Sequence, residues 1–249
     1  MPDTTEMTGP GHRPDPQPGA PARPEQLSVY ERIKAMILSN QIPPDTKVNI
    51  DKLARQLSVS QTPVREAVQR LEGDKLVARR QPRGYWTTPL LNAHELRHMF
   101  EVRLLLEPWT ARAAATDRTA NPGQDLLDEV DRFIQAYGQH EHGYELASHD
   151  VAFHDALFES VGNRFLSDAY RQIHAHLHLF RLYPADLNGE QTVAEHRRIA
   201  EAVLAADPAA AEQAMRDHLF AAMRRFSLGF TADSAHGFPE IRSTVVRRN

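Results

Sequence analysis

Four side chains in the second half of the sequence have the types and spacing needed to hold a divalent transition metal. Asp150 and His154 are four residues apart, which places them on one face of a helix. His196 and His218 fall on two later predicted helices. If a bundle brings these faces together, one carboxylate and three imidazoles form a complete ligand set for a metal such as zinc, nickel or manganese.

The spacing alone is weak evidence, because the chain contains 13 histidines. The pairs His94/His98 and His174/His178 are also four residues apart, and a lone helical histidine is more often a surface or hydrogen-bonded core residue. The prediction therefore depends on all four candidates together. Thiolate ligands are excluded, because the chain has no cysteine.

A second group of side chains has the chemistry to contact DNA. Residues 50–57 and 61–73 each carry an apolar stripe at helical spacing, and a tight turn joins them. The remaining face of the second segment carries amide, hydroxyl and guanidinium groups, which suit phosphates and base edges in a major groove. The predicted DNA contacts, including nearby cations, are Lys52, Gln61, Thr62, Arg65, Gln69, Arg70, Arg79, Arg80, Arg83 and Gly84.

The flanking segments extend this pair of helices into a winged helix-turn-helix. Ser28 and Glu31 form a capping box that opens an earlier helix. Residues 76–88 have the pattern of two short strands around a basic Pro/Gly turn. We therefore predict a DNA-binding domain over residues 28–89, followed by a short linker.

From residue 93 onward the pattern is helical, with no convincing strand. Six helices are predicted, approximately over residues 93–116, 123–138, 144–161, 165–182, 192–206 and 208–228. The expected fold class is mainly α, with an N-terminal winged helix-turn-helix and a C-terminal six-helix antiparallel bundle over residues 93–230. Residues 1–27, which are rich in proline, are predicted to be a disordered tail, and residues 231–249 a flexible one.

Composition and charge limit the classes of function. Hydrophobic residues make up 41% and charged residues 25%, with no run of 18 apolar residues and no signal-peptide pattern, so we expect a cytoplasmic protein without a membrane segment. Residues 29–90 hold 11 Lys or Arg against 6 Asp or Glu, whereas residues 91–230 hold 13 against 21. A basic first domain fits a polyanion partner, and the acidic second domain indicates a different role.

Between Pro44 and Gly84 the chain shows a specific pattern. It consists of Pro44, Leu53-Ala54, Leu57, Val59-Ser60, Thr62-Pro63-Val64-Arg65-Glu66-Ala67, Arg70-Leu71-Glu72, Leu76-Val77 and Gly84. With these residues the chain resembles the GntR family of bacterial transcription regulators, which implies a homodimer on a palindromic operator. Gln61 stands where the family often has arginine, so we expect a changed base preference, since glutamine pairs best with adenine.

Four segments of the second domain form another pattern. They are Glu101-Val102-Arg103 with Glu107-Pro108, Asp150 to Asn163 with Phe153 and His154, Glu195-His196, and Met215 to Leu219 with His218. They resemble the FCD effector domain of the FadR subfamily, in particular its six-helix VanR-type group. The resemblance implies that the four candidate ligands bind a metal whose coordination is completed by a small carboxylate effector. Arg103 is the candidate effector-binding residue, and the alternative is an ion pair with Glu107.

The sequence is compatible with three functions. The favoured one is a ligand-responsive transcription regulator, with repression as the expected mode. The dipeptide His149-Asp150 also occurs in HD-type metal-dependent phosphohydrolases, but that interpretation leaves the winged domain unexplained. A metal sensor without an organic effector is the third. Because no catalytic nucleophile can be argued from the sequence, we do not predict an enzyme.

Overall fold

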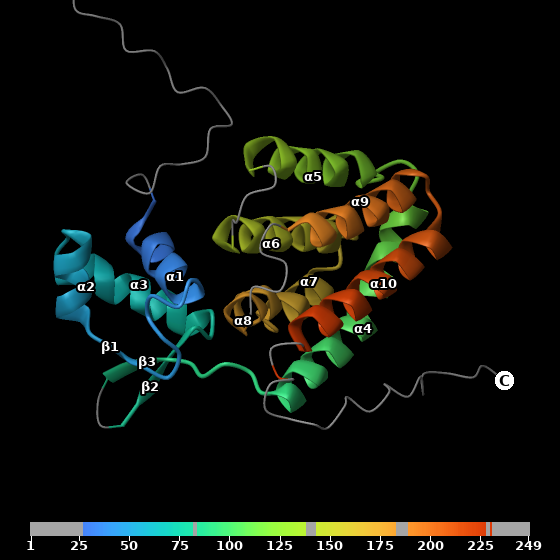
Figure 1. Ribbon diagram of the computed structural model, residues 1–249. Coiled ribbons are helices and arrows are strands. Elements are labelled where there is room, and N and C mark those ends of the chain that lie inside the picture. Colours follow the sequence, from blue (N-terminus) through green and yellow to red (C-terminus); the bar gives the residue numbers. More distant parts are fainter. Residues whose placement is uncertain (1–26, 82–83, 138–142, 183–188, 228–229, 231–249) are drawn as a thin grey trace, which may run out of the picture.

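The computed structural model describes residues 27–81, 84–137, 143–182, 189–227 and 230. Within these residues a small winged domain lies beside a larger group of helices (Figure 1). The two predicted tails, apart from Leu27, and the predicted DNA contact Arg83 lie outside the described residues. None of the described helices is long and apolar enough to cross a membrane.

The winged domain is built from three helices and a small sheet. Its elements are α1 (Val29–Leu38), β1 (Lys47–Val48), α2 (Ile50–Leu57), α3 (Gln61–Gly73), β2 (Val77–Arg80) and β3 (Gly84–Thr87). The Ser28 hydroxyl accepts a hydrogen bond from the Glu31 N–H and so caps α1. Ser58 ends α2 in the left-handed region at φ 57°, which lets the chain turn into α3.

The sheet contains one strand more than the sequence predicted. β2 and β3 pair in antiparallel fashion as expected, with Ala78 opposite Trp86, and β1 pairs with the other edge of β3. β1 has only two residues, too few to produce a recognisable alternation of apolar and polar side chains. The resulting strand order is β1-β3-β2.

The helical domain follows the predicted boundaries except in one place. Its elements are α4 (Ala93–Thr116), α5 (Gly123–Tyr137), α6 (Gly143–Ser160), α7 (Arg164–Arg171), α8 (Ala175–Leu182), α9 (Glu190–Leu204) and α10 (Pro208–Ser227). The predicted helix over residues 165–182 is interrupted, so the described part of this domain holds seven helices instead of six. His174, at φ 49°, makes the break, although no glycine or proline marks it.

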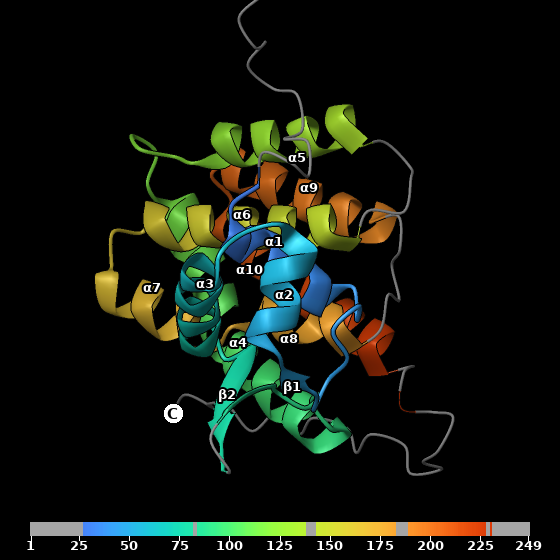
Figure 2. The same cartoon turned by 90° about the vertical axis from the view of Figure 1, so that its left-hand side faces the viewer.

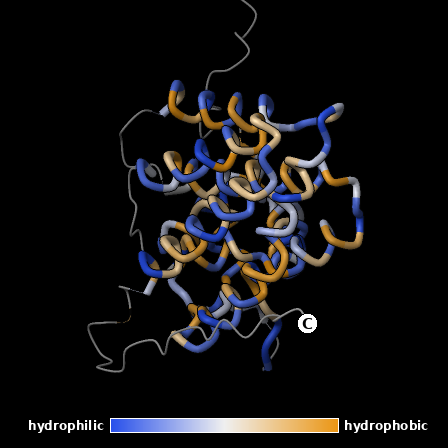
Figure 3. The backbone as a smooth tube through the Cα atoms, turned by 90° about the vertical axis from the view of Figure 1, so that its right-hand side faces the viewer, coloured by the Kyte–Doolittle hydropathy of each residue, from blue (hydrophilic) through white to orange (hydrophobic). Residues whose placement is uncertain are grey.

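Packing among these helices follows their apolar faces. α4 starts with a capping box, in which Asn92 and Glu95 satisfy each other's backbone N–H groups, and it packs along α10. Hydrophobic and hydrophilic residues alternate along the helical turns (Figure 3), as expected for helices with one buried side. A Cβ on Gly123 would lie 2.4 Å from the Leu204 Cα, so the close approach of α5 to α9 requires glycine there.

The two domains share buried side chains. Ala147 of α6 and Leu177 of α8 belong to the same apolar cluster as Ile33 and Ile37 of α1. On the same helix α8, the buried Arg181 donates hydrogen bonds of 2.8 and 2.6 Å to the side-chain and main-chain oxygens of Thr88, just after β3. Figures 1 and 2 show α1 next to α6 and α8. The winged domain therefore rests on these two helices.

Candidate functional site

The four predicted metal ligands lie together in the core of the helical domain. Asp150 and His154 come from α6, His196 from α9 and His218 from α10, and one ligand atom of each lies within 4.8 Å of the others. All four side chains are buried, with at most 5% of each residue exposed. This arrangement of one carboxylate and three imidazoles can hold a divalent metal ion.

The inner atoms of the cluster support this chemistry. The Nε2 atoms of the three histidines are buried and have no hydrogen-bond partner among the described residues. Asp150 Oδ1 lies 3.4 Å from His196 Nε2 and 3.8 Å from His154 Nε2. Because buried polar atoms are normally paired, three unpaired nitrogens around one carboxylate fit a site made for a cation.

Two of the histidines are held from outside by a carboxylate and an arginine. His154 Nδ1 lies 3.0 Å from Glu107 Oε2, and the guanidinium of Arg103 donates hydrogen bonds to both Glu107 oxygens. His218 Nδ1 lies 2.9 Å from Glu195 Oε2, and the guanidinium of Arg225 donates hydrogen bonds of 2.7 and 2.8 Å to the two Glu195 oxygens. Burial alone would raise the pKa of Glu107 and Glu195, but these partners lower each to about 2, so both are ionised.

The other two ligands have different supports. His196 Nδ1 lies 3.1 Å from His149 Nε2, and His149 Nδ1 lies 3.2 Å from Glu129. Asp150 Oδ2 is hydrogen-bonded to His176, whose Nε2 lies 2.5 Å from the Tyr170 hydroxyl. Neither His149 nor His176 was predicted as a partner of the ligands. His149 was noted only in the His149-Asp150 dipeptide of the HD-type alternative, and only tertiary packing brings it to His196 and brings His176 to Asp150.

The protonation states of the buried ligands favour metal binding at neutral pH. Burial lowers the pKa of His154 to about 4, and it also lowers the pKa of His196 well below the usual value. Burial would raise the pKa of Asp150, but His176 and other histidines hold it well below its ordinary range. His154 and His196 are therefore neutral at neutral pH and Asp150 is ionised, and these are the forms that bind metals.

The remaining histidine pairs do not join this cluster. His94 and His98 lie on the exposed start of α4, with ring centroids 3.9 Å apart. His174 lies at the break between α7 and α8, and His178 lies one turn into α8. Neither pair belongs to the candidate metal-binding group found among the described residues.

Arg103, the candidate effector-binding residue, is fully buried and already paired. Its guanidinium contacts both oxygens of Glu107, so the structure contains the ion pair that was the alternative interpretation. An effector carboxylate would have to compete with Glu107 for this guanidinium. The effector-binding role of Arg103 remains a prediction.

The predicted DNA-binding residues of α3 form an exposed face. Gln61, Thr62, Arg65, Gln69 and Arg70 are all exposed, and so is Lys52 on α2. Figure 2 shows α2 and α3 facing the viewer, away from the helical domain. The face is thus available to a DNA groove, while the individual contacts remain predictions.

Several of the predicted cations have partners within the protein. The Arg65 guanidinium donates to Gln61 Oε1 at 3.2 Å, and the Arg70 guanidinium lies 4.0 Å from the centroid of the Tyr30 ring. In the wing, Arg79 pairs with Glu72 and Arg80 with Asp45, close to Gly84 at the start of β3. These contacts lie at exposed or half-buried side chains, so phosphates can replace them.

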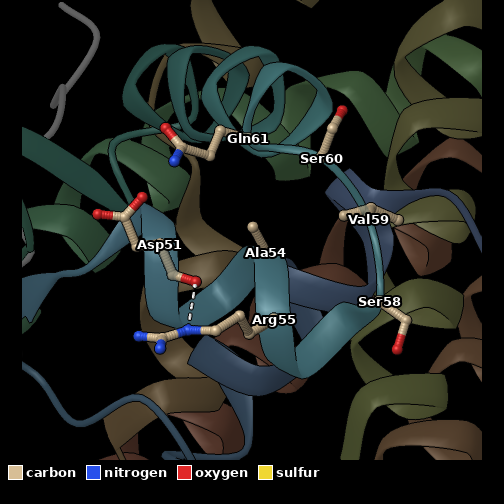
Figure 4. A pocket seen from close by; sticks show the side chains of 7 residues that line it. All are labelled: Asp51, Ala54, Arg55, Ser58, Val59, Ser60 and Gln61. Carbon is tan, nitrogen blue, oxygen red and sulfur yellow. Dashed lines mark hydrogen bonds between the residues drawn. The ribbon is translucent and has the colours of Figure 1, made fainter.

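A hollow of about 460 Å³ lies between α2 and the start of α3. Its lining includes Asp51, Arg55 and Gln61 together with Ser60, the N-cap of α3, whose side chain makes no capping hydrogen bond (Figure 4). Arg55 Nε donates to the Asp51 carbonyl oxygen at 3.3 Å within this hollow. The hollow therefore belongs to the helix-turn-helix surface and is separate from the metal cluster.

Each half of the chain matches a known protein family. Residues 25–86 match the family "Bacterial regulatory proteins, gntR family", and residues 98–221 match the family "FCD domain". The chain belongs to the GntR family and carries an FCD domain. It is therefore a helix-turn-helix transcription regulator, as the sequence patterns predicted, and the FadR subfamily with its VanR-type group is consistent with the FCD match.

Individual relatives of this GntR-family chain agree. It is 26% identical to the "Uncharacterized HTH-type transcriptional regulator YdhC" of Bacillus subtilis, over 78% of this chain and 88% of the relative. It is 28% identical to the "HTH-type transcriptional regulator LutR" of the same organism, over 74% and 93%. Its fold is similar to "E. coli McbR/YncC", with a TM-score of 0.64 and 19% identity over 81% of this chain and 96% of that one.

Proposed function

We propose that this GntR regulator is controlled by a metal-bound small carboxylate in its helical domain. The observation that carries the proposal is the buried cluster of Asp150 and three histidines with unpaired Nε2 atoms. Residues 28–89 would bind the operator, and residues 93–230 would bind metal and effector and form the dimer. Zinc, nickel and manganese all suit this ligand set, and a bound ion would supply a Lewis acid that accepts anionic ligands.

The charge balance of the site favours an anionic effector. Among the four ligands only Asp150 is an anion, and the nearby Glu107 and Glu195 are each balanced by an arginine. A dication bound by Asp150 and three neutral imidazoles would therefore keep a net positive charge in a buried place. A carboxylate would offset that charge, whereas a neutral or cationic effector would not.

The DNA partner is a palindromic operator contacted by α3. Arg65 and Gln61 are assigned to base edges, and Lys52, Thr62, Gln69 and Arg70 to bases or phosphates. The wing cations Arg79, Arg80 and Arg83, with Gly84, are assigned to phosphates or the minor groove. We infer repression, relieved or modified by the effector, and action in the cytoplasm.

A homodimer is supported by an exposed apolar face on α4. Val102, Leu105 and Trp109 lie at helical spacing on one side of this helix and are 41%, 61% and 51% exposed. Contiguous exposed apolar side chains of this size indicate a protein interface, and a second copy of the chain is the partner that a palindromic operator requires. Leu105→Glu should convert a dimer to a monomer in analytical ultracentrifugation, whereas Leu104→Glu, on a less exposed side, should disturb folding instead.

The experiment for the proposed function combines DNA selection and metal analysis. Genomic fragments selected by the purified protein should contain a palindrome, and elemental analysis should find one divalent transition metal per chain. Small dicarboxylates or hydroxy acids should raise the melting temperature of the metal-loaded protein and not of the metal-free protein. If Arg103→Ala keeps that response, the effector site lies elsewhere than at Arg103.

Two other functions are distinguished by the same preparations. If metal alone releases the operator, and no carboxylate changes the affinity further, the protein is a metal sensor. If the metal-loaded protein hydrolyses a phosphodiester with turnover, it is a hydrolase of the HD type. We propose that it is not an enzyme, because regulation of DNA binding accounts for both of its domains.

A further inference from the structure

We propose that Glu107–Arg103 and Glu195–Arg225 are two positioning pairs, which fix the tautomers of His154 and His218 so that each Nε2 faces the metal. This inference depends on the proposed metal site. It gives Arg103 a role different from effector binding, and it assigns a role to Arg225, which no sequence pattern indicated.

The geometry at His218 shows the principle. Nδ1 lies 2.9 Å from Glu195 Oε2, and both oxygens of that carboxylate already accept from the Arg225 guanidinium at 2.7 and 2.8 Å, so Nδ1 is the atom that carries the hydrogen. Nε2 then keeps its lone pair, and it is the nitrogen without a partner among the described residues. Arg225 also reaches the Thr192 hydroxyl at 3.3 Å, which ties the pair to the start of α9.

The same arrangement recurs at His154 with residues from other helices. Glu107 and Arg103 are four residues apart on α4, whereas His154 is on α6. The Arg103 Nη2 donates to Glu107 Oε2 at 3.1 Å, and that same oxygen lies 3.0 Å from His154 Nδ1. Neither ring nitrogen of His154 makes a well-aligned hydrogen bond among the described residues, but Nδ1 is the one within hydrogen-bond distance of a carboxylate. All three side chains are at most 1% exposed, so water cannot replace these contacts.

The arginines account for how an ionised carboxylate can stand beside each ligand. A buried carboxylate without a counter-charge is costly, and a bidentate guanidinium both balances the charge and prevents rotation of the carboxylate. Outer partners of this kind orient metal-binding histidines in general. His196 is supported differently, by the imidazole of His149, so the two arginine-held histidines are a distinct set.

The first measurement needs no variant. Long-range ¹H–¹⁵N correlation spectra of the metal-free full chain, labelled at histidine, distinguish imidazoles protonated at Nδ1 from those protonated at Nε2. His154 and His218 should both be protonated at Nδ1. If either is protonated at Nε2, the inference is wrong.

The second measurement is zinc affinity, by competition with a chromophoric chelator. Glu107→Gln and Glu195→Gln keep the shape of the side chain but remove its charge, so each should weaken zinc binding by about 10–100-fold. Glu212→Gln is the matched control, because Glu212 also pairs with arginines, Arg112 and Arg216, but touches none of the ligands. It should bind zinc as the parent does.

The possible outcomes distinguish a failure of the positioning pairs from a failure of the proposed metal site. If the parent protein does not bind zinc, the proposed metal site fails. If the parent binds zinc and the Glu107 and Glu195 variants bind it as tightly as the Glu212 variant, the positioning pairs fail while the site survives. Arg225→Lys, which keeps the charge but not the bidentate geometry, should lower the affinity less than Glu195→Gln does.

Discussion

Removal of the metal should lower the free energy of unfolding, and the size of this effect follows from the number of buried nitrogens left without a partner. Each buried polar atom without a partner costs about 1–3 kcal/mol. The three Nε2 atoms of His154, His196 and His218 therefore add roughly 3–9 kcal/mol to the free energy of the metal-free fold, which a bound ion would remove. One kcal/mol shifts the melting temperature of a chain of this size by about 2–4 °C, so the lower bound of the shift is about 6 °C.

Mass action gives a similar figure. An ion present at 100 times its dissociation constant stabilises the folded state by about 2.7 kcal/mol. The assay is a thermal melt of EDTA-stripped protein, repeated with added zinc at a fixed pH. His154→Ala and His218→Ala should lose bound metal and the zinc-dependent shift, whereas His98→Ala, on the exposed start of α4, should keep both.

If the stripped and zinc-loaded forms of the parent protein melt at the same temperature, zinc does not fill the buried cluster. If the His98 variant loses as much metal as the His218 variant, the metal binds outside that cluster.

Three further results are expected. Arg65→Ala should weaken operator binding by about 1–3 kcal/mol at constant salt, and unchanged affinity in a mobility-shift titration would exclude a base contact. Leu177→Ala should speed amide hydrogen exchange in α1, whereas Leu179→Ala should speed it mainly in the helical domain. Each substitution should lower the free energy of unfolding by about 2–5 kcal/mol. Identical exchange patterns in the two variants would contradict the core that the two domains share. Burial lowers the pKa of His154 and of His178 to about 4 from 6.5, so the unfolded chain binds more protons between these values. Melting of metal-free protein should therefore occur at lower temperature as the pH falls from about 6.5 to 4, and a rise would contradict the assignment.

The sequence was informative where local signals and long patterns coincide. The cap at Ser28, the two apolar stripes of the helix-turn-helix and the ends of α4 and α10 all follow from residue types within a few positions. The four candidate ligands were predicted together because their segments resemble those of one family. The structure brings them together as expected, while metal binding itself remains a prediction.

Features that depend on tertiary contacts were missed. The break at His174 carries no glycine or proline, and it turns α8 so that His176 reaches Asp150. His176 contacts Asp150 from a position whose spacing gave no signal, and His149 had been noted only as part of the dipeptide His149-Asp150 of the HD-type alternative. Likewise, the pairing of Arg225 with Glu195 joins residues 30 positions apart, which no local pattern connects.

The buried side chains shared between the domains affect how the protein can be divided. A fragment ending after the wing would uncover the apolar surface of α1 that Ala147 and Leu177 now cover. It would also lose the hydrogen bonds from Arg181 to Thr88. Its affinity for DNA would then include the cost of an incomplete core, and so would understate what α3 contributes in the whole chain. The smallest piece that preserves the native winged domain includes α6 and α8.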